Sequence, residues 1–77
     1  MANYEIRKGA DMGAALAELR RQLGLNQHDA GVRAGIDPNY LSKIESGRSV
    51  SLLEHELRIF RRLGARVVVE FPAIRDE

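Results

Sequence analysis

The stretch DPNYLSK, from Asp37 to Lys43, gathers short polar side chains at the start of a predicted helix. Asn39 and Lys43 are four residues apart, so a helix brings their amide and ammonium groups to one face, beside Ser42. These groups donate and accept hydrogen bonds but supply no obvious covalent chemistry. A helix with short side chains near its N-terminus can also enter a DNA major groove. The stretch therefore predicts a binding surface.

Residue patterns for catalysis or metal binding are not found in the sequence. The chain has no cysteine, and its two histidines, His28 and His55, are too isolated to share a metal ion and are expected to be solvated helix residues. No nucleophile lies near a plausible base, and no glycine loop of the phosphate-binding type occurs. We expect no enzyme, no cofactor and no metal.

Length and composition limit the class of protein. A chain of 77 residues forms one domain with a marginal core, so a partner subunit is a natural source of further burial. The lack of cysteine predicts a reducing compartment, with the cytoplasm as the default. No apolar run reaches the length of a signal sequence or a membrane span, so no membrane partner is expected.

The charge neither requires nor excludes a nucleic-acid partner, because the net charge is +1 and the pI is near 8.2. Within residues 27–48, three bases are matched by three acids. This balance counts mildly against DNA binding. The charged residues are Arg33, Lys43 and Arg48 against Asp29, Asp37 and Glu45.

Two helices are expected first along the chain, from apolar spacing and from start and stop signals. One covers residues 11–24, begins at Asp11 and ends at Gly24. The other covers residues 27–34, after an Asn26 cap and before Gly35. The apolar face of the earlier helix contains Met12, Leu16, Leu19 and Leu23.

Two further helices follow. Asp37 and Pro38 suit the N-cap and first helical position of a helix that runs from Pro38 to about Ser46 and completes the stretch 26–48. The last covers residues 51–64, with a capping box predicted between Ser51 and Glu54. Its wide apolar face contains Leu53, Leu57 and Phe60, with Leu52, Ile59 and Leu63 beside them.

Strands are expected only near the two ends of the chain. Residues 65–71 are β-branched and aromatic and stop at Pro72, which predicts a strand. Residues 3–8 alternate Tyr4 and Ile6 with polar neighbours and suit a short strand or an ordered arm. We expect a frayed tail at residues 75–77.

Two short helices joined at Gly35 and flanked by two others form a helix-turn-helix arrangement. The positions expected to face inward are Val32, Ile36, Leu41 and Ile44. On GLNQ, Gly35 and YLSKIESG, the chain resembles the phage-repressor and Cro-like, or XRE-type, helix-turn-helix family over about residues 11–63. Within that family it is similar to small HipB-like antitoxin regulators. The resemblance implies a mainly α, four- to five-helix lambda-repressor-like domain that binds double-stranded DNA.

The resemblance also implies roles for individual residues. Phosphate contacts fall on Asn26, Gln27 and Arg48, and base contacts fall on Pro38, Asn39, Tyr40, Ser42 and Lys43. Arg20 would form a partly buried, architectural ion pair with Glu45.

Some positions depart from the family pattern. Ala30 and Gly31 stand where leucine and alanine are usual, which predicts a trimmed core and a looser helix. Asp37 and Pro38 also have a simpler interpretation as helix-start residues, and Tyr40 could either line the DNA surface or cover the core beside Ala30. The spacings of Gly9 with Gly13 and of Gly31 with Gly35 are interpreted as coincidences.

Pairing of the strand at residues 65–71 is left with two alternatives. It could pair antiparallel with the same segment of a second copy, with Val67, Val69 and Phe71 on the face toward the last helix and Val68 between them. It could instead pair with the segment containing Tyr4 and Ile6, within or between chains. In the first alternative, the strands of two copies form an intersubunit sheet.

Three functional classes follow. The first is a dimeric repressor on an inverted-repeat operator, and the second is an antitoxin or adaptor that masks a partner enzyme, a toxin protein, with DNA binding secondary. The third, an enzyme, has no support in the residues. The arginines Arg58, Arg61 and Arg62 are expected to form a solvated face or, alternatively, a surface for a partner or the DNA backbone.

Overall fold

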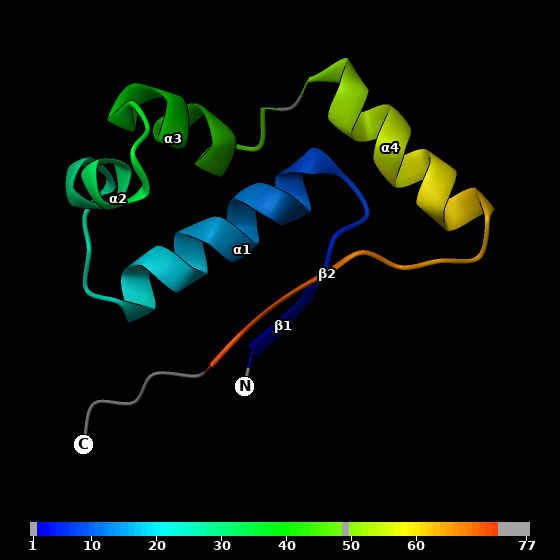
Figure 1. Ribbon diagram of the computed structural model, residues 1–77, viewed down its shortest axis with the longest axis horizontal. Helices are drawn as coiled ribbons and strands as arrows, with labels where there is room; N and C mark the ends of the chain where they lie inside the picture. The colour runs from blue at the N-terminus through cyan, green and yellow to red at the C-terminus, as the bar shows by residue number, and fades with distance from the viewer. Residues whose placement is uncertain (1, 49, 73–77) are drawn as a thin grey trace.

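The computed structural model describes residues 2–48 and 50–72 of the chain. In these residues it is mainly helical, with one two-stranded sheet, which confirms the helical fold class. Figure 1 shows α1 between the α2–α3 pair and the sheet, with α4 beside the start of α1. The expected frayed tail lies outside the described residues. The elements are β1 (Ala2–Glu5), α1 (Gly9–Gln22), α2 (Gln27–Ala34), α3 (Pro38–Glu45), α4 (Ser51–Arg62) and β2 (Val68–Phe71).

Helices α2 and α3 begin and turn as the local sequence predicts. Asn26 Oδ1 accepts a hydrogen bond from Asp29 N at 2.7 Å, and Asp37 Oδ1 accepts from Asn39 N at 2.8 Å. Gly35 has φ 77°, the left-handed conformation that glycine adopts at least cost. These local contacts fix where α3 starts relative to α2.

Helix α1 begins at Gly9, two residues before its predicted start at Asp11. Asp11 Oδ2 accepts hydrogen bonds from Arg7 N at 2.9 Å and from Lys8 N at 3.1 Å. Asp11 therefore lies inside the first turn and bonds back to the residues before it, as an acidic residue at the third helical position can.

The predicted capping box of α4 is wrong. Ser51 is the first helical residue, with Val50 at the N-cap position, and Glu54 Oε1 accepts from Gly9 N at 2.6 Å. The N–H groups in the first turn of a helix lack intrahelical acceptors, and a carboxylate there is also favoured by the helix dipole. Glu54 thus ties α4 to the start of α1.

Strand β2 pairs antiparallel with β1 of the same chain, which is one of the alternatives left open by the sequence. Tyr4 lies opposite Val69, and Ile6 N donates to Val67 O at 2.8 Å just beyond the strands. The Tyr4 ring stacks on Phe71, with 5.8 Å between ring centroids. The strand is shorter than predicted, and pairing between subunits stays a prediction.

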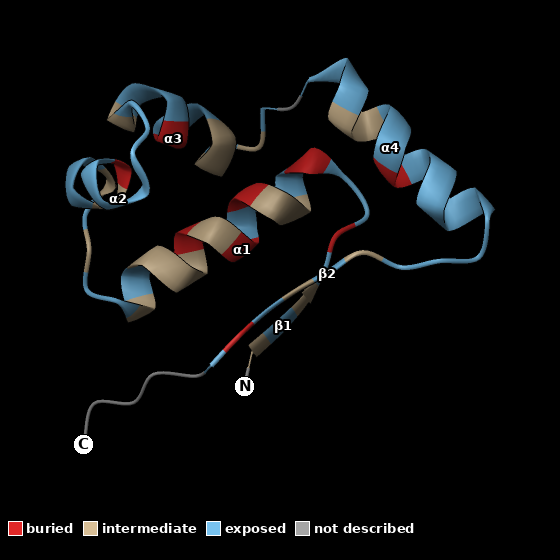
Figure 2. Ribbon diagram, in the orientation of Figure 1, coloured by how far each residue is buried: buried red, intermediate tan, exposed pale blue. Residues whose placement is uncertain are grey.

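The core lies between α1, the sheet and the inner side of α4 (Figure 2). Ile6, Ala15 and Leu57 form its buried centre. Around them pack the partly buried side chains of Tyr4, Met12, Leu53, Val67 and Val69. So few fully buried large side chains give a small core, as expected for a chain of this length.

Several apolar residues expected to face inward are instead exposed. Val32 is 66% exposed and Ile36 is 36% exposed, so only Leu41 and Ile44 of that predicted set hold α3 from inside. Leu52, Ile59 and Phe60 on α4 are 68%, 55% and 48% exposed, and Leu63 at the C-cap of α4 is 80% exposed. The apolar face of α4 is wider than the surface that the rest of the chain covers.

Two glycines whose spacing was interpreted as coincidence allow close backbone approach. A Cβ at Gly13 would lie 2.2 Å from Ile44 O, and one at Gly31 would lie 2.9 Å from Ile36 O. Neither distance is compatible with van der Waals radii. The small residues therefore let α3 and the turn before it pack directly on α1 and α2.

The trimmed core predicted at Ala30 corresponds to a hollow of about 170 Å³ between α1 and α2. Ala30 lines it together with Leu16, Leu19 and Leu25. A larger side chain at residue 30 would extend into this space.

We predict that Gly13→Ala lowers the free energy of unfolding by about 1–3 kcal/mol, because the added methyl group forces α3 away from α1. At an unconstrained helix position the same change would raise stability by about 1 kcal/mol. Urea unfolding measures the free energy of unfolding of Gly13→Ala and of a control variant, Ala14→Gly. Ala14 is exposed on the same helix, and its change to glycine should cost about 0.5–1 kcal/mol. A more stable Gly13→Ala protein would contradict the close approach.

Candidate nucleic-acid interface

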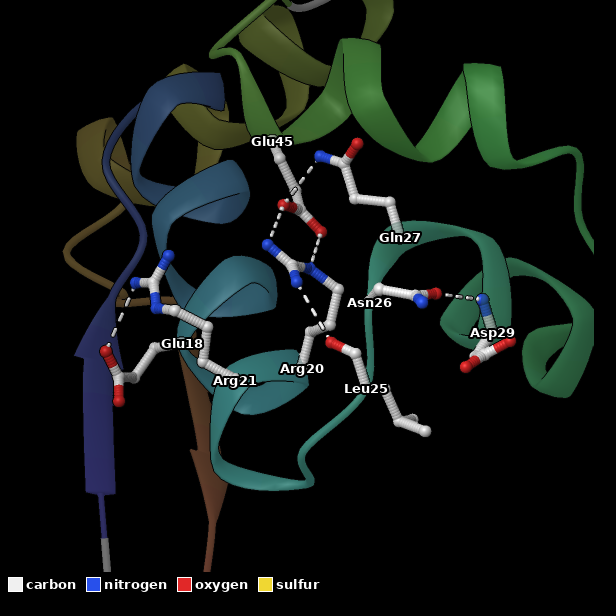
Figure 3. A network of polar contacts seen from close by, with 8 residues as sticks. All are labelled: Glu18, Arg20, Arg21, Leu25, Asn26, Gln27, Asp29 and Glu45. Atoms are coloured by element: carbon white, nitrogen blue, oxygen red, sulfur yellow. Dashed lines mark hydrogen bonds and ion pairs between the residues drawn. The ribbon is translucent and has the colours of Figure 1, made fainter.

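A bidentate ion pair connects α1 to the C-terminal end of α3 (Figure 3). Arg20 Nε lies 2.8 Å from Glu45 Oε2, and Arg20 Nη2 donates to Glu45 Oε1 at 3.0 Å. The side chains are only 16% and 6% exposed. Arg20 Nη1 also donates to Leu25 O at 3.0 Å, in the connection between α1 and α2. One guanidinium thus joins three parts of the chain, in the pairing that the family resemblance implies.

Gln27 extends this cluster to α2. Its Nε2 donates to Glu45 Oε1 at 3.1 Å, so the first residue of α2 contacts the last residue of α3. The sequence prediction gave Gln27 only a phosphate contact and missed this bond. Residues 18 apart carry no local signal of such a contact. The bond fixes the two helices of the helix-turn-helix at their far ends, opposite the Gly35 turn.

The pKa of the Glu45 carboxyl reflects two opposing effects. Burial by itself raises the pKa of Glu45. The hydrogen bonds from Arg20 and Gln27 and the charge of Arg20 outweigh burial and hold the pKa below its ordinary value of 4.5. Glu45 is therefore the ionised acceptor of the cluster at neutral pH.

The side of α3 away from α1 presents the polar face predicted from the sequence. Asn39, Ser42 and Lys43 are exposed, while Leu41 between them is 2% exposed. Arg48, just beyond the end of α3, is also exposed. These side chains can reach a ligand without any rearrangement of the helix.

Pro38 and Tyr40 occupy different surroundings from the other predicted base contacts. Pro38 is half-buried, and its Cγ would lie 3.0 Å from a Cβ at Gly31, so its ring packs on α2. Tyr40 is 56% exposed and lines a hollow of about 260 Å³ with Met12 and Leu53. It therefore borders the polar face on the side of α4, and both alternatives for its role stay predictions.

Two of the residues predicted to contact phosphate, Asn26 and Gln27, lie at the N-terminus of α2. Asn26 is exposed while its Oδ1 caps the helix, and Gln27 is half-buried because of its bond to Glu45. The backbone N–H groups of a helix N-terminus favour an anion such as phosphate. Asn26 thus combines a capping role with a position where a phosphate contact is possible.

The charge balance predicted within residues 27–48 is altered by folding. Glu45 is neutralised by Arg20, which lies outside that stretch, and its side chain is almost fully buried. The exposed charges that remain are Arg33, Lys43 and Arg48 against Asp29 and Asp37. The surface of the two helices is therefore more basic than the sequence count indicated.

Three of the four predicted dimerisation residues lie in β2, and the fourth, Val67, directly precedes it. Phe71 is buried, and Val67 and Val69 are half-buried in the core of the chain itself. Val68 is 44% exposed on the opposite face. Of the four, Val68 offers the most exposed side chain to a second subunit.

Metal and membrane sites are not seen in residues 2–48 and 50–72. No group of three or more histidine, aspartate or glutamate side chains there could hold a metal ion. His28 and His55 are both exposed. Within the same residues, every helix is too short or too polar to cross a bilayer.

Two short helices joined at Gly35, with a polar face on the second, define a helix-turn-helix fold. A family model described as "Helix-turn-helix domain" matches residues 11–66, and the chain belongs to this family. No curated protein and no solved structure matches the chain significantly. The domain indicates a DNA-binding regulator, which agrees with the coarser prediction from the sequence.

We predict that Arg20→Met lowers the free energy of unfolding by about 3 kcal/mol, because it leaves the buried Glu45 carboxylate without its cation. The double variant Arg20→Met with Glu45→Leu should lose less, since no unpaired charge then remains. Chemical unfolding of both proteins measures the difference. If the double variant is the less stable of the two, the buried-charge explanation is wrong.

The same pair gives a pH dependence. Because the folded pKa of Glu45 is lowered, its stabilisation is complete above about pH 4.5 and is lost as the pH falls through the folded pKa. We predict that Glu45→Gln is less stable than the native chain at pH 7 and that the difference shrinks below pH 4.5. Thermal unfolding from pH 7 to pH 3 tests this, and a constant difference would contradict it.

Proposed function

We propose that the protein is a dimeric transcriptional repressor of the toxin–antitoxin, HipB-like type that binds an inverted-repeat operator in double-stranded DNA. The main support for the proposal is that α3 is held firmly on one side and exposes polar side chains on the other. Its polar side is exposed at Asn39, Ser42 and Lys43, while Leu41 and the Arg20–Glu45 pair hold its other side. Such preorganisation suits a helix that enters a major groove.

Each exposed group of α3 has a base edge that suits it. The Asn39 amide can form two hydrogen bonds with adenine, and the Lys43 ammonium can donate to guanine O6 and N7. Ser42 can contact either kind of edge. Asn26, Gln27 and Arg48 take phosphate contacts, which orient the domain without distinguishing sequences. Pro38 begins α3 and sets its direction, and Tyr40 lies at the side of the DNA major groove.

Dimerisation follows from the need for affinity and symmetry. One helix with three polar contacts covers only part of a typical specific site, whereas two copies about 34 Å apart contact two half-sites one helical turn apart. The segment after α4, with Leu63 and Gly64 leading into β2, is the feature that resembles the HipB-like regulators. The role is one of binding, in the cytoplasm, and not of catalysis.

A second candidate function is supported by the outer face of α4. Leu52 and Ile59 on α4 are 68% and 55% exposed, and Leu63 at its C-cap is 80% exposed, so three large apolar side chains lie open to solvent close together. An adaptor or antitoxin that masks a toxin protein would cover such a face. In that case the helix-turn-helix serves mainly to regulate its own promoter.

We predict that selection of the purified chain against a random duplex pool, at about 0.15 M salt, enriches an inverted repeat with half-sites one turn apart. On that site, Lys43→Ala should cost about 1–3 kcal/mol of binding free energy, because a base contact is lost. Gln27→Ala should weaken binding to all duplexes alike. Salt near this concentration suppresses non-specific phosphate binding, which would hide the difference.

The matched control is Arg21→Ala, which removes one positive charge from an exposed α1 side chain paired with Glu18. It should leave the enriched site bound with nearly native affinity. Equal losses for Arg21→Ala and Lys43→Ala would mean that only net charge matters. A pool without enrichment would favour the adaptor function.

A further inference from the structure

The pairing of β2 with β1 determines which backbone groups of β2 point outward from the sheet. Ile6 N donates to Val67 O, and Tyr4 lies opposite Val69, so these residues turn their backbone groups toward each other across the sheet. Backbone groups alternate in direction along an antiparallel strand. The N–H and C=O groups of Val68 and Glu70 therefore point away from β1. Among residues 2–48 and 50–72 the sheet has only two strands, so this edge pairs with no other strand there.

The outer edge of β1 is less suited to another strand. Arg7 N donates to Asp11 Oδ2 at 2.9 Å, and Arg7 O accepts a hydrogen bond from Arg61. These two bonds occupy the backbone of the residue two positions after Glu5, and the chain enters α1 at Gly9, two residues further on. Additional pairing at this edge is limited to Asn3 and Glu5 among the described residues. The edge of β2 is the more open of the two.

The exposed face of β2 also carries a self-complementary charge pattern. Arg66 and Glu70 lie two residues before and after Val68, and all three line one shallow hollow on this face with Asn3 and Glu5. The Arg66 side chain is 74% exposed, and its Nη1 is 4.0 Å from Glu5 Oε1, at the outer limit of an ion pair. A positive, an apolar and a negative residue thus follow one another at alternate positions.

We propose that this edge binds β2 of a second copy, antiparallel, with the two-fold axis at Val68. Val68 then lies opposite Val68 of the other copy, and each Arg66 lies opposite a Glu70. This register forms two favourable cross-strand ion pairs and a continuous sheet in the order β1-β2-β2-β1. It rests on the dimer proposed above and specifies the surface through which that dimer forms.

The other registers are less favourable for stated reasons. An axis at Val69 places each Val68 opposite a Glu70 and leaves both charges without an opposite partner. An axis at Glu70 places two carboxylates directly opposite each other, which is destabilising. Only the axis at Val68 pairs every charged side chain of this face with an opposite charge across the new ladder.

Single-cysteine variants test the register, since the chain contains no other cysteine. In a hydrogen-bonded antiparallel pair the Cα atoms are about 5.5 Å apart, a distance that a disulfide spans. Val68→Cys should therefore give a covalent dimer under mild oxidation with glutathione disulfide. Glu70→Cys is the matched control, because its two copies would be separated by about 13 Å along the strands. It should stay uncrosslinked.

Charge reversal tests the ion pairs independently. Glu70→Arg should raise the dissociation constant of the dimer roughly tenfold, because two like-charged pairs replace two favourable ones. Adding Arg66→Glu in the same chain should restore it to within about threefold. Glu70→Arg is the more direct single change, since Arg66 also faces Glu5 within the chain. Sedimentation equilibrium measures each dissociation constant.

The outcomes separate the two proposals. If the native chain sediments as a monomer at micromolar concentration, the dimeric repressor fails together with its interface. If it is a dimer but Glu70→Cys crosslinks in place of Val68→Cys, or neither does, the dimer stands and this interface is wrong. A crosslinked Val68→Cys dimer and a charge swap that restores affinity support the interface.

Discussion

The Arg20–Glu45 ion pair holds the three helices of the candidate interface together. Glu45 is the last residue of α3, and its carboxylate accepts hydrogen bonds from α1 through Arg20 and from α2 through Gln27. A buried carboxylate is stable only when its hydrogen-bond partners are in place. Glu45 therefore favours the arrangement that keeps α1 and α2 beside α3. The polar face of α3 is therefore positioned by the almost fully buried carboxylate of Glu45.

The small core explains why backbone approach is so close. With few large side chains fully buried, the chain gains contact area by bringing α3 against α1 at Gly13 and the preceding turn against α2 at Gly31. The sheet and Leu57 supply the second half of the core, where Ile6 is 2% exposed. Within the described part of the chain, the exposed outer face of α4 and the outer edge of β2 are surfaces that a partner could bury.

The sequence predicts well the features that local residues control. The bounds of α2, the start of α3 and both of their caps follow from Asn26, Asp37 and the glycine between the helices. Contacts between distant residues could not be deduced in this way: Glu54 bonds to the start of α1, and Gln27 bonds to α3. The exposure of Val32 and the role of Gly13 depend likewise on tertiary packing. At the candidate interface, the sequence predicted the exposed polar residues of α3. It did not predict that Pro38 is half-buried, because that burial comes from packing on α2.

We propose that α3 and the N-terminus of α2 form the nucleic-acid interface. The most direct measurement is an NMR titration of the ¹⁵N-labelled chain with a short duplex that carries the selected site, at two salt concentrations. We expect the largest amide shifts at Asn26, Asn39, Ser42 and Lys43, with little change in β1 and β2. Shifts concentrated on the outer face of α4 and absent from α3 would contradict it.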